Sequence, residues 1–281
     1  MSCLRPMTKK DGTVFPCGKC PPCINRLTSG WAFRLLQEER NSISSHFITF
    51  TYDTPNLVTT PHGLRSLCKY HLQCFFKRLR KHNSGKKIKY YAVGEYGSQT
   101  KRPHYHAIIF NADVNTIELA WTQRENKHEK PISIGEIYYG DVSGHSIGYT
   151  LKYICKGKTV PAFDKDDRQR EFSIMSKGLG ISYLTDNMLM WHNADLLNRQ
   201  YVNLKGDIKI AMPRYYREKI YVTEYQKELI RIGGSLITQH DFLEQIKEGL
   251  TQRDFGTKLY SQRVDAAFRR HNIKKHEKLL L

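Results

Sequence analysis

The 281-residue sequence predicts an α+β protein in which a mainly antiparallel sheet carries flanking helices. Three observations support this class. The predicted elements follow the order helix, strand, helix, two strands, helix, strand, helix, which is typical of a split βαβ sheet with helices on one face. The strand-like residues 87–96 and 102–110 flank the loop GSQTK, which indicates a β-hairpin. Helical patterns dominate beyond residue 200 and predict a helical C-terminal extension.

The first part of the chain predicts a helix, a strand and a second helix. Apolar residues at near-turn spacing predict a helix from Ile24 to about Arg40. The segment HFITFTY (46–52) is β-branched and aromatic and is followed by Asp-Thr-Pro, so it predicts a strand. Leucines and phenylalanines at helical spacing make residues 64–82 an amphipathic helix with a basic outer face.

After the hairpin, the pattern predicts a helix at 114–123, a strand in EIYYGDV (136–142), and a helix over 144–157 that ends at Gly157. Further helical patterns occupy 218–232, 239–251 and 257–271. We therefore expect three parts, namely a Cys/Pro-rich leader (1–30), a central domain with the sheet (31–200) and a mainly helical C-terminal region (201–281).

Charge is the most informative bulk property. The chain has 45 Lys and Arg against 27 Asp and Glu, a formal net charge of +18. Such an excess favours nucleic acid or an anionic membrane as partner. Basic residues alternate with aromatic ones in KRLRKH and PRYYREK, and no basic amphipathic terminal helix is evident, so we expect nucleic acid and no membrane. The candidate DNA-binding residues are Arg78, Arg80, Lys101, Arg102 and Arg214.

The sequence also indicates a reducing compartment. No apolar run approaches the roughly 20 residues that span a bilayer. The first ten residues, MSCLRPMTKK, have no continuous apolar stretch of the kind found in secretory signals. Seven cysteines are an odd number, which does not suggest a disulfide framework. We therefore expect a cytoplasmic protein.

The hairpin carries a candidate metal site. Alternation along a strand places His104 and His106 on one face and Tyr105 on the other. A register that pairs Gly97 with Arg102 would set Glu95 opposite His104, with Cβ atoms about 5 Å apart. Two imidazoles and a carboxylate suit Mn²⁺, Mg²⁺ or a related divalent ion and leave positions open for a substrate. The alternative is a pair of hydrogen-bonded histidines on a half-buried strand.

A second candidate element is the helix segment YTLKYICK. Tyr149 and Tyr153 are four residues apart, so both phenols lie on one helix face, and Lys152 and Lys156 repeat at the same interval. A phenol becomes a nucleophile when nearby positive charge favours its deprotonation. By itself the pattern equally fits an amphipathic helix whose tyrosines pack on the sheet.

The leader contains CxxCxxC, formed by Cys17, Cys20 and Cys23. Three thiolates at this spacing can hold a structural Zn²⁺ if a fourth ligand arrives from elsewhere, for instance Cys3. The alternative is a set of free thiols in a turn shaped by proline and glycine. An iron–sulfur cluster shares the spacing, but no fourth clustered cysteine supports it.

Taken together, these motifs give the sequence a family resemblance. It resembles the HUH rolling-circle replication initiators, most closely those of small single-stranded DNA phages of the microvirus, gokushovirus-like type. FITFTYD is similar to their first motif, GEYGSQTKRPHYHAIIF to their metal motif and YTLKYICK to their paired-tyrosine motif. The resemblance covers roughly residues 15–220 and includes CGKCPPC, SIMSKGLGISYL and PRYY. Tyr105 departs from the pattern, because many relatives have an aliphatic residue there.

The resemblance implies an HUH endonuclease fold, with a split βαβ sheet of the ferredoxin or RRM kind, and a nicking reaction. A metal ion held by Glu95, His104 and His106 would assist attack by Tyr149 or Tyr153 on single-stranded origin DNA. The products would be a 5′-phosphotyrosine and a 3′-OH, and a second attack would rejoin the strand. Lys152 and Lys156 would neutralise phosphate. Implied partners are the origin DNA and a host polymerase and helicase, in the cytoplasm of a bacterial host.

The sequence contains no GxxxxGK[ST] loop, so strand separation is expected to come from a host motor or from supercoiling. Three other functions stay open. One is a transposase- or relaxase-like nuclease of the same superfamily, although relaxases usually place the tyrosine before the histidines. Another is a non-catalytic single-stranded DNA-binding module. The third is a metallohydrolase that forms no covalent DNA adduct.

Overall fold

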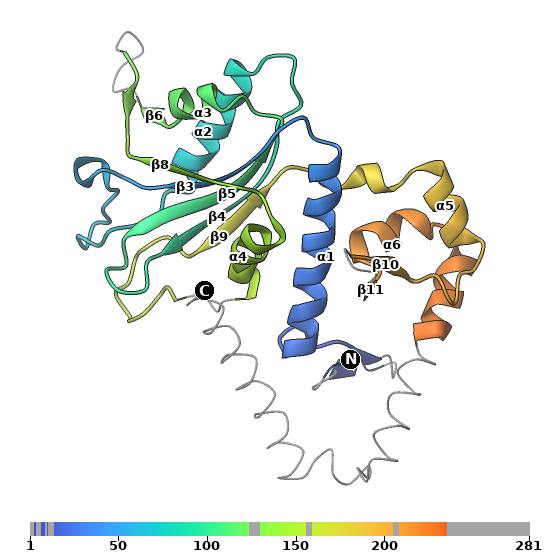
Figure 1. Ribbon diagram of the computed structural model, residues 1–281. Coiled ribbons are helices and arrows are strands. Elements are labelled where there is room, and N and C mark those ends of the chain that lie inside the picture. Colours follow the sequence, from blue (N-terminus) through green and yellow to red (C-terminus); the bar gives the residue numbers. More distant parts are fainter. Residues whose placement is uncertain are drawn as a thin grey trace. The chain divides into compact units, whose positions relative to one another are not determined.

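The computed structural model describes Cys3, Met7, Thr8, Lys10 and residues 14–123, 130–155, 159–204 and 208–234 (Figure 1). For residues 8, 14, 15 and 152–155 it describes the backbone alone. The chain divides into two compact units, one formed by Trp31–Tyr183 and the other by Met1–Gly30 with Leu184–Leu281. No helix among the described residues has the length and apolar character required to cross a bilayer.

The larger unit is built on a five-stranded sheet with the order β8-β3-β5-β4-β9. Every neighbouring pair of strands is antiparallel, which confirms the predicted α+β class and its antiparallel sheet. The predicted strands are all present, whereas β9 was not predicted. The strand bounds are β3 Ser45–Phe50, β4 Lys89–Tyr96, β5 Pro103–Phe110, β8 Ile137–Gly140 and β9 Phe172–Met175. Two short strands, β6 (Thr122–Gln123) and β7 (Ile132–Ser133), pair separately.

Helices cover both faces of the sheet, so the expectation of helices on one face was wrong (Figure 1). One face packs on α2 (Lys69–His82) and contributes to a core that contains Phe50, Ile109 and Phe75. The other face packs on α4 (Gly144–Cys155) and on residues 31–40 of α1, in a second core with Ile108 and Ile147. The reason is that β4 and β5 are buried on both sides along most of their length, and a sheet with two apolar faces needs two covers.

The helix bounds differ from the predicted ones at several ends. α1 spans Pro21–Arg40 and begins three residues earlier than predicted, since proline is well tolerated in the first turn of a helix. α2 begins at Lys69 instead of residue 64, because Thr59 and Arg65 pair in an isolated bridge and keep the preceding chain extended. α3 (Asn115–Ala120) is shorter than predicted. The predicted helix end at Gly157 lies outside the described residues.

Tyr105 explains where α2 starts. Its hydroxyl accepts a hydrogen bond from the backbone N–H of Cys68 at 2.8 Å and donates to the carbonyl of the same residue at 3.1 Å. It also lies 2.9 Å from the Tyr52 hydroxyl. Cys68 is the residue before α2 and has extended backbone angles. The buried phenol therefore replaces the missing side-chain cap and joins the sheet to the helix.

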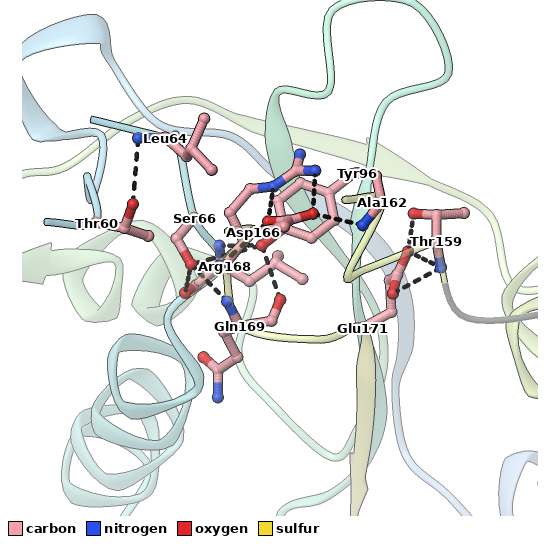
Figure 2. Close-up of polar contacts among 11 residues, drawn as sticks. Thr60, Leu64, Ser66, Tyr96, Thr159, Ala162, Asp166, Arg168, Gln169 and Glu171 are labelled. Carbon is pink, nitrogen blue, oxygen red and sulfur yellow. Dashed lines mark hydrogen bonds and ion pairs between the residues drawn. The ribbon is translucent and has the colours of Figure 1, made fainter. Parts of the chain in front are cut away.

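The segment 159–171, between α4 and β9, is clipped to the end of β4 (Figure 2). The Tyr96 hydroxyl donates to the Gln169 carbonyl at 2.7 Å and accepts from the Leu67 N–H at 3.0 Å. Arg168 holds Asp166 with two bonds of 2.8 and 2.7 Å, and its guanidinium lies 5.0 Å from the Tyr96 ring centroid. These contacts fix the strand end that carries Glu95.

The smaller unit combines the chain's beginning with the segment after residue 184. It contains β1 (Met7–Thr8), β2 (Val14–Phe15), α5 (Asp186–Asn193), β10 (Tyr201–Asn203), β11 (Lys209–Ala211) and α6 (Arg214–Ile220). The β10–β11 hairpin was not predicted. The predicted helix 218–232 is instead two helices, because residues 221–223 interrupt it before a helical stretch at 224–234. The predicted helices at 239–251 and 257–271 lie outside the described residues.

We predict that Tyr96→Phe lowers the free energy of unfolding by about 1–3 kcal/mol, because it leaves a buried N–H and a buried carbonyl without their hydroxyl partner. Urea denaturation followed by circular dichroism measures this loss. Tyr225→Phe, at an exposed tyrosine, is the matched control and should shift the midpoint little. Equal midpoints for the two variants would contradict the clip.

Candidate metal and tyrosine site

The hairpin brings two histidines and a glutamate to one point. The ladder pairs Glu95 with His104 directly, and Gly97 N–H donates to the Arg102 carbonyl at 3.0 Å, which confirms the predicted register. His104 Nε2 lies 2.7 Å and His106 Nε2 3.0 Å from the same oxygen, Glu95 Oε1. The ligand atoms of the three residues all lie within 4.8 Å of one another.

Hydrogen bonds behind the two imidazoles fix their orientation. His104 Nδ1 lies 3.1 Å from the Arg102 carbonyl. Since a carbonyl only accepts, Nδ1 carries the hydrogen and Nε2 presents its lone pair to Glu95. Two acceptors face each other in that tautomer, which requires a cation, either a proton or a metal ion, between them. The side chains present therefore fit a divalent metal ion.

Thr49 does the same for the second imidazole. Its Oγ1 lies 2.8 Å from His106 Nδ1, and the β3–β5 ladder places Thr49 directly opposite His106. The sequence analysis did not single out this threonine. The signal was present, because alternation from Phe47 in FITFTYD puts Thr49 on the face that a neighbouring strand shares with the histidines.

Burial strengthens the electrostatic coupling of the three groups. Glu95 is 4% exposed and His106 is 5% exposed. Burial acts to raise the pKa of Glu95, but the hydrogen bonds and charges of His104 and His106 outweigh it and hold the pKa below its usual value. The carboxylate is therefore ionised at neutral pH and available as an anionic ligand.

Tyr149 of α4 lies beside this cluster. Its ring centroid is 5.1 Å from that of His106, with the two planes nearly perpendicular at 89°. Phe47 completes the contact, since its ring lies 5.9 Å from that of His106 and 6.2 Å from that of Tyr149. The helix is held there by the buried Ile147 and Leu151, one turn apart. A phenol of the paired-tyrosine motif and a candidate metal ligand thus share one face of the sheet.

The other residues of that motif are described less fully. Lys152 and Tyr153 lie in α4 by their backbone, so Tyr153 follows Tyr149 by about one helical turn. Their side chains, and the whole of Lys156, lie outside the described residues. Tyr105 points to the opposite face, as alternation predicts, and burial raises the pKa of its phenol.

The predicted DNA-binding residues are dispersed. Lys101 is exposed in the hairpin loop, and Arg102 donates to the Tyr52 carbonyl at 2.5 Å beside the cluster. Arg78 and Arg80 lie on α2, which covers the opposite face of the sheet, and Arg78 donates to the Ala120 carbonyl at 2.9 Å. Arg214 is exposed at the start of α6 in the smaller unit and pairs with Glu218.

A second cluster lies in the smaller unit. Cys3 joins Cys17, Cys20 and Cys23, with all four sulfurs within 4.8 Å of one another. Burial acts to raise the pKa of Cys17, but N–H groups of Lys19 and Cys20 donate to its sulfur and the pKa falls to about 6. Burial raises the pKa of Cys23 to about 12. Both clusters are therefore candidate metal sites by their donor atoms.

We predict that Thr49→Val weakens Mn²⁺ binding about 10–100-fold, because removing the hydroxyl frees the imidazole of His106 to rotate. Isothermal titration calorimetry at constant pH measures the Kd. Thr51→Val is the matched control, since Thr51 Oγ1 donates to the Glu136 carbonyl instead. An unchanged Kd in Thr49→Val would show that the hydroxyl does not orient the ligand.

Comparison with known proteins agrees with this geometry. Residues 45–158, which include β3, the hairpin and α4, match the model of a family described as replication-associated protein ORF2. Replication-associated protein ORF2 of Spiroplasma virus 4 is 29% identical over 231 residues, covering 76% of this chain and 69% of the relative. ORF4 of Chlamydia phage 1 is 28% identical, covering 75% of this chain and 54% of the relative.

VP4 of Bdellovibrio phage phiMH2K, also a replication-associated protein, is 28% identical, covering 73% of this chain and 67% of the relative. No solved structure matches the chain. The three relatives are phage proteins of one description, and the matched region holds both the candidate metal ligands and the tyrosine helix. Over residues 45–158 the chain therefore belongs to the replication-associated protein ORF2 family of microvirus-like phages.

Proposed function

We propose that the protein is a replication initiator that nicks single-stranded DNA at the phage origin and later rejoins it. The observation that carries the proposal is the placement of Tyr149 5.1 Å, ring to ring, from His106, on the face where Glu95 and both histidines converge. A nucleophile beside a divalent metal site is the arrangement that phosphoryl transfer requires.

The reaction exchanges one phosphoester for another. The phenolic oxygen of Tyr149 bonds to the scissile phosphorus, the bond from phosphorus to the 3′ oxygen breaks, and the phenolic proton ends on that oxygen. The products are a 5′-phosphotyrosine and a 3′-OH that a host polymerase extends. Because the number of phosphoester bonds is unchanged, the reverse attack by a 3′-OH rejoins DNA without ATP.

The ligand set has a limited role. Mn²⁺ or Mg²⁺ bound by Glu95, His104 and His106 would polarise the phosphate and offset its negative charge. The hydrogen bonds to Thr49 and to the Arg102 carbonyl keep both Nε2 atoms directed at that point. Phe47 packs against His106 and Tyr149 and limits the water beside them.

The neighbouring motif residues complete the scheme. Tyr153, one helical turn after Tyr149, serves as the second nucleophile, so that one tyrosine holds the displaced strand while the other cuts the regenerated origin. Lys152 and Lys156 offset phosphate charge along the same helix. The expected setting is a bacterial host, where a host helicase separates the strands.

The test uses single-stranded oligonucleotides that tile the genome encoding the protein, with Mn²⁺. We predict an adduct of protein and DNA that survives denaturant for the oligonucleotide containing the origin, because the 5′ end is covalently bound. Tyr149→Phe with Tyr153→Phe should abolish the adduct, and Glu95→Gln should reduce its rate at least 100-fold. Denaturing gel electrophoresis with labelled DNA measures both.

Tyr70→Phe, at an exposed tyrosine on α2, is the control and should form the adduct at the normal rate. Nicking at the normal rate by the double tyrosine variant would refute the tyrosine assignment. Binding without any adduct in the wild-type protein would indicate a non-catalytic DNA-binding module. Cleavage without an adduct would indicate a metallohydrolase.

Tyr138 of β8 is well placed to hold the DNA. The ladders set Tyr138 opposite Thr49 and Thr49 opposite His106, so the three lie in one row on one face. Tyr138 is 55% exposed. Its neighbour Tyr139 is 42% exposed but points to the other face, where its hydroxyl meets Glu118. An exposed ring beside the cleavage site suits stacking with a base.

We predict that Tyr138→Ala weakens binding of a single-stranded oligonucleotide about 5–100-fold, since stacking contributes about 1–3 kcal/mol per base. Fluorescence anisotropy at fixed salt measures the Kd, and Tyr138→Trp should restore most of the affinity. Tyr139→Ala, one residue away on the opposite face, should stay within about twofold of the wild type. Equal losses in the two alanine variants would mean that the effect comes from β8 as a whole.

A further inference from the structure

The four cysteines of the smaller unit have the spacing of a tetrahedral metal site. Cys3 Sγ and Cys20 Sγ are 3.7 Å apart. Sulfurs around zinc lie about 3.8 Å apart, because each Zn–S bond is about 2.3 Å and the geometry is tetrahedral. A disulfide would need about 2.05 Å, and all four are free cysteines.

The backbone supports this cluster through N–H groups that point at sulfur. Cys20 N–H donates to Cys17 Sγ at 3.3 Å, and Lys19 N–H donates to it at 3.4 Å. Cys17 N–H donates to Cys3 Sγ at 3.2 Å. Gly18 makes the turn, with a φ of +73° that side chains rarely adopt. Donors of this kind stabilise negatively charged sulfur and thus favour thiolates over thiols.

The ligands come from three separate places in the chain. Cys3 lies before β1, Cys17 and Cys20 lie in the turn after β2, and Cys23 lies in the first turn of α1. Cys20 is fully buried. β1 pairs antiparallel with β2, and this pairing returns the chain so that Cys3 reaches the turn. The cluster has four protein ligands, which would leave no open position for a substrate.

We propose that Cys3, Cys17, Cys20 and Cys23 bind one Zn²⁺ in a closed structural site. Soft thiolates select zinc over Mn²⁺ and Mg²⁺, so this site is chemically separate from the glutamate and histidine cluster of the larger unit. The ion anchors the chain before β1 to the start of α1. It acts on stability, and it takes no part in the nicking reaction.

The experiment measures metal content and thermal stability of the full chain purified under reducing conditions. Inductively coupled plasma and native mass spectrometry should find one zinc per chain. The His104→Ala, His106→Ala double variant should keep that zinc, which separates this site from the nicking site. Cys3→Ser should lower zinc affinity at least 100-fold, whereas Cys74→Ser, a cysteine of α2 outside the cluster, should retain it.

A chelator should lower the melting temperature of the wild-type protein but not of the Cys3→Ser variant. Full-length chain without zinc would overturn the proposal, whether free thiols titrate or a disulfide lowers the mass by two hydrogens. Bound iron with visible absorbance would overturn it in favour of an iron–sulfur cluster. Because adduct formation is a separate readout, loss of zinc and failure of the nicking proposal are distinguishable.

Discussion

The structure of the larger unit depends on the register of a single β-hairpin. With Glu95 opposite His104, a carboxylate and two imidazoles meet at one oxygen. A shift by one residue would turn Glu95 to the other face, because side chains alternate along a strand. The five-residue loop and the Gly97–Arg102 hydrogen bond set this register, and the clip on Tyr96 secures the end of the strand.

The two faces of the sheet have separate roles. The face on α2 holds the larger aromatic core and the linked hydroxyls of Tyr52 and Tyr105, which join the sheet to the start of the helix. The face on α4 is apolar at one end, where Ile147 and Leu151 pack, and polar at the other, where the ligands converge. Packing at the apolar end positions Tyr149 next to the polar end.

The two cysteine and histidine clusters differ in hardness and in openness. The set of Glu95, His104 and His106 has three donors, which leaves coordination positions for a phosphate. The four cysteines form a closed set of soft donors. Their positions in different units of the chain match this difference, since one cluster lies on the sheet beside a tyrosine and the other at the start of a long helix.

The sequence by itself determined the features that rest on local periodicity. Strand alternation and the short loop were enough to place Glu95 opposite His104, to put Tyr105 on the far face, and to predict a helix through Tyr149. Composition indicated nucleic acid. Only the tertiary structure decided which distant elements meet. It put helices on both faces, added β9, ended the extended chain at Cys68, placed Thr49 behind His106 and brought Cys3 to the CxxCxxC turn. These contacts join residues far apart in the chain, and their formation depends on packing that a periodic pattern does not encode.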